Sequence, residues 1–111
     1  MPGTSRLLLV EDTPSLSMVY EQVLRRAGHP VATAATLAEA RAQFEALRPR
    51  LVLLDLQLPD GDGLDFLDHL HAEAPEVRVI VVTANGSINR AVQAMRAGAF
   101  DFLVKPFDES R

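Results

Sequence analysis

The chain has no cysteine and no tryptophan, and its ten arginines are accompanied by a single lysine. Without cysteine it can form no disulfide, no thiolate metal site and no cysteine nucleophile. No apolar run approaches the ~18 residues of a membrane-spanning helix, and the apolar run near the start is too short for a signal peptide. The formal charge of −4 comes without a basic stripe. We therefore expect a cytoplasmic protein that binds neither membrane nor nucleic acid directly.

Short apolar runs alternate with segments of helical periodicity over the 111 residues, which are enough for one domain. Several of the runs are apolar on consecutive residues, as in a parallel sheet whose two faces are both covered by helices. A fifth helix that would complete the alternation is missing or truncated. The expected strands are 7–10, 31–35, 51–54, 77–82 and 100–104, with amphipathic helices near 16–27, 37–47, 64–70 and 88–95.

Polar residues stand at the ends of four of these strands. Glu11 and Asp12 follow the first strand, and Asp55 follows the third. Thr83 follows the fourth strand, and the lone lysine, Lys105, follows the fifth. Ligands of open parallel sheets bind beyond the carboxyl ends of the strands, so we expect these side chains to converge at one edge.

The chemistry of such a cluster follows from its charge. Three neighbouring carboxylates repel one another unless a cation neutralises them, and an all-oxygen ligand set suits Mg²⁺. A carboxylate beside Mg²⁺, an ammonium and a hydroxyl is a plausible nucleophile for a phosphoryl group. The oxygens of the transferred group need neutralisation, which Mg²⁺, Lys105 and Thr83 would share. The lysine fits this task because its ammonium is a compact point charge, whereas arginine carries a planar fork.

Here the chain resembles the phosphoacceptor receiver domain of bacterial two-component response regulators. The resemblance spans about residues 6–108 and rests on four motifs in this order: Leu9-Val10-Glu11-Asp12, Leu54-Asp55-Leu56-Gln57-Leu58-Pro59 with Gly63, Val82-Thr83-Ala84, and Lys105-Pro106. It implies a flavodoxin-like, doubly wound α/β fold, with a five-stranded parallel sheet in the order 2-1-3-4-5.

The resemblance also implies roles for individual residues. Asp55 is expected to be the phosphorylated aspartate, with Thr83 and Lys105 beside it. Direct Mg²⁺ ligands would be Asp12, Asp55 and the backbone carbonyl of Gln57, with Glu11 acting through water. The switch pair would be Thr83 and Phe102, and the Lys105-Pro106 peptide bond is expected to be cis. The chain departs from the commonest pattern at Glu11, an aspartate in many members, and at Phe102, which lacks the hydroxyl of a tyrosine.

The segments Ala84-Asn85-Gly86-Ser87 and 91–103 resemble regulators of the nitrogen-control class, which activate sigma-54-dependent transcription. Expected partners are a sensor histidine kinase and a downstream output, namely an ATPase and a DNA-binding domain that lie outside this chain. Residues 1–111 would then be a receiver domain excised from a longer regulator. Phosphorylation would remodel the face formed by helix 88–95 and strand 100–104, through which a homodimer could also form. We further expect exposed apolar surface where a fifth helix is missing, and therefore self-association or reduced stability.

Two alternatives compete with the signalling switch. One is a phosphohydrolase of the same topology that uses Asp55 on external substrates. Such enzymes need a second acid two residues after the nucleophile, and Gln57 cannot give and take a proton there. The other is a receiver-like binding module that is not phosphorylated, against which the complete set of acids, hydroxyl and lysine argues. We therefore expect a signalling domain that catalyses only its own phosphorylation and dephosphorylation.

Overall fold

The computed structural model describes residues 7–84 and 88–105. Its main sheet has five parallel strands in the order β2-β1-β3-β6-β7, which confirms the expected flavodoxin-like topology. A separate two-stranded sheet pairs β4 with β5. The elements are β1 Leu7–Val10, α1 Pro14–Arg26, β2 Val31–Ala34, α2 Leu37–Leu47, β3 Leu51–Leu54, β4 Gln57–Leu58, β5 Gly61–Asp62, α3 Gly63–Glu73, β6 Arg78–Thr83, α4 Ile88–Arg96 and β7 Asp101–Val104.

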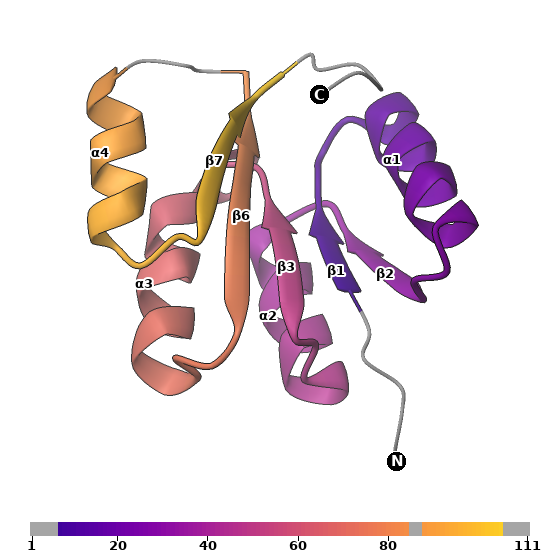
Figure 1. The fold of residues 1–111 in the computed structure, drawn as a ribbon, viewed down its shortest axis with the longest axis horizontal. Coiled ribbons are helices and arrows are strands. Elements are labelled where there is room, and N and C mark those ends of the chain that lie inside the picture. The colour runs from indigo at the N-terminus through magenta and orange to yellow at the C-terminus, as the bar shows by residue number, and fades with distance from the viewer. Residues whose placement is uncertain (1–6, 85–87, 106–111) are drawn as a thin grey trace.

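Helices cover the two faces of the sheet unequally. One face carries the larger core, in which side chains of α2, α3 and α4 pack on alternate residues of the central strands. At its centre the rings of Phe44 and Phe66 meet edge to face, with centroids 6.5 Å apart. The other face carries α1, which lies far from α4 in Figure 1 and contributes only partly buried side chains to a smaller cluster. This second face therefore remains partly open.

The sequence marks the ends of the helices with recognisable caps. The Thr36 hydroxyl accepts a hydrogen bond from the Glu39 N–H at 3.0 Å, and the Glu39 carboxylate accepts one from Ala35 at 2.7 Å. A third cap was not expected: both carboxylate oxygens of Asp60 accept from the first N–H groups of α2, at 2.7 and 3.0 Å. After α1, Gly28 adopts φ +95°, the left-handed conformation that glycine commonly takes after a helix.

The largest departure from the sequence prediction is the small β4–β5 hairpin. No strand is predicted between residues 54 and 64, but Gln57 pairs with Asp62 and Leu58 with Gly61 in antiparallel register. The hairpin fixes the loop that follows Asp55. Element boundaries shift by one to three residues elsewhere, since α1 begins at Pro14, α3 ends at Glu73 and β6 begins at Arg78. Within residues 7–84 and 88–105, four helices complete the fold, and none is long and apolar enough to cross a lipid bilayer.

Candidate functional site

The polar residues at the strand ends lie together at one edge of the main sheet. Glu11 and Asp12 follow β1, Asp55 follows β3, Lys105 follows β7, and Thr83 is the last residue of β6. The backbone pairing continues one step beyond β7, because the Lys105 N–H donates to the Thr83 carbonyl at 2.8 Å. The parallel register thus brings residues that are distant in sequence to the same edge of the sheet.

Lys105 joins two of the acids. Its Nζ lies 2.6 Å from Glu11 Oε1 and 2.8 Å from Asp55 Oδ2. The exposed fractions of the three side chains are 8% for Lys105, 2% for Glu11 and 6% for Asp55, so water screens these contacts only weakly. Burial lowers the pKa of Lys105, but the hydrogen bonds and charges of Asp55 and Glu11 outweigh it and hold the pKa above its usual value. The ammonium therefore stays charged at neutral pH.

The remaining carboxylate oxygens are held by backbone N–H groups. Asp55 Oδ1 accepts from the N–H of Gln57 at 3.0 Å, and Glu11 Oε2 accepts from the N–H of Thr13 at 3.1 Å. These bonds fix the rotamer of each carboxylate. Both acids are thus oriented before any ligand arrives.

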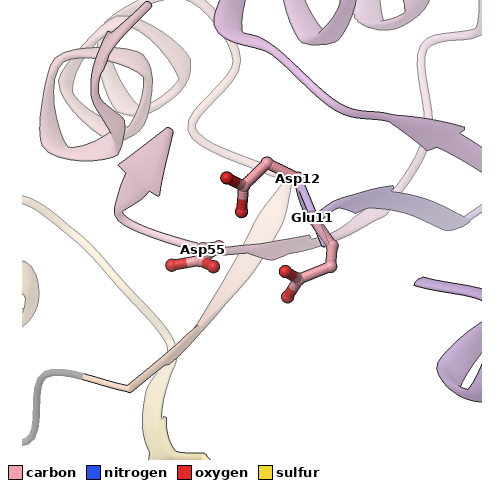
Figure 2. A group of neighbouring side chains, drawn as sticks. All are labelled: Glu11, Asp12 and Asp55. Atoms are coloured by element: carbon pink, nitrogen blue, oxygen red, sulfur yellow. The ribbon is translucent and has the colours of Figure 1, made fainter. Parts of the chain in front are cut away.

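The acids form a cluster suited to a divalent cation. Glu11, Asp12 and Asp55 each offer an oxygen within 4.8 Å of the others, and Figure 2 shows them projecting from the ends of β1 and β3. Among the described residues, the one ammonium of Lys105 stands against three carboxylates at the site, an excess of two negative charges. A hard cation with oxygen ligands, such as Mg²⁺, matches both this charge and this donor set.

A pocket of about 420 Å³ opens over the cluster. It is large enough to admit a phosphoryl group and ordered water. Gln57 also lines this pocket, beside Asp55. The residues that line it are Asp12, Thr13, Leu16, Tyr20, Asp55, Gln57, Ala84 and Lys105.

The two residues of the expected switch lie behind this pocket. The Thr83 side chain is fully buried and is not among the described residues that line the pocket. Phe102 is half-buried, packs against the larger core, and pairs in register with Val81 on the neighbouring strand. The expected cis peptide involves Pro106, which lies outside the described residues.

Gly63 permits the loop after Asp55 to close. Its N–H donates to the Leu56 carbonyl at 2.8 Å, at the start of α3. A Cβ at Gly63 would stand 2.7 Å from the Asp55 carbonyl oxygen and 2.9 Å from the Leu56 Cα, which are backbone atoms that cannot rotate away. Glycine is thus needed for this close approach.

Sequence reasoning missed two features of the site region. Tyr20 is not among the predicted site residues, yet it lines the acidic pocket. The signal that could have found it is the single tyrosine of the chain, placed in an otherwise aliphatic stripe. The second feature is an ion pair between Arg90 of α4 and Asp62 at 2.9 Å, which connects α4 to the hairpin beside Asp55.

Comparison with known proteins gives one family. Residues 7–111 match the family described as the response regulator receiver domain. The alginate biosynthesis transcriptional regulatory protein AlgB of Pseudomonas aeruginosa is 41% identical over 101 residues, covering 91% of this chain and 22% of AlgB. The nitrogen assimilation regulatory protein NtrX of Azorhizobium caulinodans is 38% identical over 107 residues, covering 95% of this chain and 24% of NtrX. The solved beryllofluoride-activated NtrC4 receiver domain dimer is similar with a TM-score of 0.90 and 38% identity, covering 96% of this chain and 88% of that one.

The fold and the acidic site thus agree with a signalling domain of two-component systems. The chain belongs to the response regulator receiver domain family. As the sequence predicted, it is similar to the receivers of nitrogen-control-class (sigma-54 activator) regulators. The chain spans less than a quarter of the length of AlgB and NtrX, at 22% and 24%.

Proposed function

We propose that this domain is a phosphorylation-activated switch that accepts a phosphoryl group on Asp55 from a sensor histidine kinase. A carboxylate oxygen of Asp55 attacks the phosphorus of phosphohistidine, the phosphorus–nitrogen bond breaks, and the imidazole leaves with the electron pair. The observation that carries this proposal is the buried ammonium of Lys105, which lies 2.8 Å from Asp55 and 2.6 Å from Glu11 under an open acidic pocket.

Each residue of the site has its own role in phosphoryl transfer. Asp12, Asp55 and the Gln57 carbonyl would hold Mg²⁺, with Glu11 acting through water; the bound ion supplies charge neutralisation for the phosphoryl oxygens. Lys105 neutralises one of these oxygens directly, because its ammonium already lies against the nucleophile. The N–H of Gln57, which donates to Asp55 at 3.0 Å, keeps the carboxylate oriented for attack.

The conformational response to phosphorylation would begin at the buried hydroxyl of Thr83. Phosphorylation adds charge at Asp55 and draws Thr83 toward the phosphoryl group, which leaves space that Phe102 can enter from its half-buried position. The surface that changes is formed by α4 and β7. Exposed apolar side chains already mark it, namely Ile88, Val92 and Met95 on α4 and Leu103 and Val104 on β7.

This surface would transmit the signal to the other domains of a longer regulator. Residues 1–111 are proposed to be the receiver part of a protein that also carries an ATPase and a DNA-binding domain and controls transcription in the cytoplasm. The length of AlgB and NtrX supports this, since the chain spans 22% and 24% of them. The beryllofluoride-activated NtrC4 receiver is a dimer, which supports a homodimer of this domain. The exposed apolar side chains of α4 and β7 make that face the proposed contact.

The test is covalent labelling. The chain is incubated with acetyl phosphate, with and without Mg²⁺, and its intact mass is measured. The proposal expects one added phosphoryl group, acid-stable and alkali-labile, only when Mg²⁺ is present. A chain that takes up no phosphoryl group with Mg²⁺ would contradict it.

Two other functions are distinguished by simple assays. For a phosphohydrolase, Gln57 occupies the place of the second acid, and its amide cannot transfer a proton. Turnover of a generic phosphate ester would favour that function. For a binding module that is never phosphorylated, calorimetry should detect no Mg²⁺ binding. The domain is expected to bind Mg²⁺ and to turn over only its own aspartyl phosphate.

A further inference from the structure

Tyr20 of α1 stands between two cavities. It lines the acidic pocket above Asp55, and it also lines an apolar groove of about 380 Å³ between α1 and the sheet. Asp55 borders both spaces, and Glu11 borders the groove. Val23, one turn along α1, lines the groove only. Tyr20 is thus the residue of α1 that lines both spaces.

The phenol of Tyr20 senses the charges of the site. Burial raises its pKa, the ammonium of Lys105 lowers it, and the carboxylates of Glu11 and Asp55 raise it again, with a net increase. The group is therefore a neutral hydroxyl at physiological pH. A tyrosine suits this boundary because its ring can pack among the aliphatic side chains of the groove while its polar end reaches the acidic pocket.

Water in the groove can hydrolyse an aspartyl phosphate. In hydrolysis a water oxygen attacks the phosphorus, the bond from phosphorus to the Asp55 oxygen breaks, and inorganic phosphate leaves with a proton released to solvent. Asp55 lines the groove as well as the pocket, so water can approach it from two spaces. A closed wall towards the groove limits water to the route through the pocket, and excluding water protects a reactive intermediate.

We propose that Tyr20 is a positioning residue of the phosphoacceptor site, whose ring closes the wall between groove and pocket and so prolongs the life of the aspartyl phosphate. This inference rests on the proposed function of Asp55. A ring that only filled space on α1 would behave like Val23, which lines the groove without touching the pocket. A wall role and simple space filling therefore predict different hydrolysis rates when the Tyr20 or the Val23 side chain is removed.

The first test measures hydrolysis. The full chain is phosphorylated with acetyl phosphate and Mg²⁺, the donor is removed, and loss of the phosphoryl group is followed by intact mass. Tyr20→Ala should lose it at least about threefold faster than the wild type, since the wall is open. Tyr20→Phe keeps the ring and should match the wild type, as should Val23→Ala, the matched control on the same helix. If Tyr20→Ala does not fold, Tyr20→Leu, which lacks the ring, takes its place with the same expectation.

Wild-type rates in Tyr20→Ala or Tyr20→Leu would overturn the inference, and so would equal acceleration in Val23→Ala. A wild-type chain that takes up no label contradicts the proposed function instead. A second measurement does not need the phosphoryl group: the chain has one tyrosine and no tryptophan, so its intrinsic emission comes from Tyr20. Titration with Mg²⁺ should change that emission, whereas unchanged emission on Mg²⁺ binding would place Tyr20 apart from the site.

Discussion

The ammonium nitrogen of Lys105 lies 2.8 Å from a carboxylate oxygen of Asp55, although 50 residues separate the two in the chain. The same nitrogen contacts Glu11, so one cation is shared by two buried acids. Breaking such a buried contact by removing one partner leaves an uncompensated charge, which is strongly destabilising. When Asp55 takes up a phosphoryl group, Lys105 is the nearest positive side chain to it, and its contacts must rearrange.

Replacing Lys105 with arginine should impair switching although the charge is kept. The Lys105 side chain is only 8% exposed, and its nitrogen is enclosed by Glu11 and Asp55, so a planar fork has no room where a point charge fits. Hydrogen exchange of α4 and β7, measured with and without beryllofluoride, should change less in Lys105→Arg than in the wild type. A variant with the wild-type response would remove this steric argument.

Gly63→Ala should damage both stability and labelling. The new Cβ would stand 2.7 Å from the Asp55 carbonyl, so the loop must move, at a cost of more than about 2 kcal/mol in the free energy of unfolding. Gly28→Ala is the matched control: a Cβ there meets nothing within 4 Å, and strain at φ +95° costs about 1–2 kcal/mol. Urea unfolding measures the loss of stability in each variant, and acetyl phosphate labelling measures whether Asp55 can still be phosphorylated. Normal labelling of Gly63→Ala would show that the close approach does not position Asp55.

The ion pair of Asp62 with Arg90 should contribute to stability only at a pH high enough to keep the Asp62 carboxylate charged. The hydrogen bond from Arg90 lowers the pKa of Asp62 the most, burial opposes it, and the Leu64 N–H lowers it further. A carboxyl group with a lowered pKa stabilises the fold above its unfolded pKa, and this contribution disappears as the pH falls through the folded value, below 3.8.

Asp62→Asn retains a good N-cap for α3 and loses only the charge. Since the pair is partly exposed, the expected loss of stability is about 0.2–1 kcal/mol near neutral pH. Urea unfolding should show this difference at about pH 6 and little of it at about pH 3. Asp68→Asn, an exposed position on the same helix, should show no difference at either pH. A constant difference for Asp62→Asn across the pH range would rule out the charge as its cause.

The open face beside α1 should make the 111-residue chain self-associate. None of the residues of α1 is buried, and Met18, Val19 and Val23 are 60%, 52% and 51% exposed, next to the apolar groove. Sedimentation should show concentration-dependent association that Val19→Lys reduces. A monodisperse monomer with a high melting temperature would count against this expectation.

The strands and their polar ends could be predicted because each rests on local sequence. An apolar run such as 51–54 followed by Asp55 identifies both the strand and the edge at which its acid stands. The strand order came from the family resemblance, and the parallel register bears it out. The roles of Thr83 and Phe102 concern a phosphorylated state, and that of the Gln57 carbonyl concerns bound Mg²⁺, so all three remain predictions.

Other features could not be predicted because they depend on contacts between distant segments. Asp60 caps α2 from 23 residues away, and Arg90 pairs with Asp62 from 28 residues away. Neither pair has a sequence pattern of its own, since exposed charged residues are common in loops and on helices. Tyr20 was missed for a similar reason: helical periodicity shows which side of α1 it occupies but not that it also lines the acidic pocket.

The measurement that tests the central claim most directly is labelling of Asp55→Asn. The amide keeps the size of the carboxylate but is no nucleophile for phosphorus. With acetyl phosphate and Mg²⁺, the wild type and the control Asp68→Asn should each gain one phosphoryl group by intact mass, and Asp55→Asn should gain none while it remains folded by circular dichroism. Wild-type labelling of Asp55→Asn would contradict the assignment of Asp55 as the phosphoacceptor.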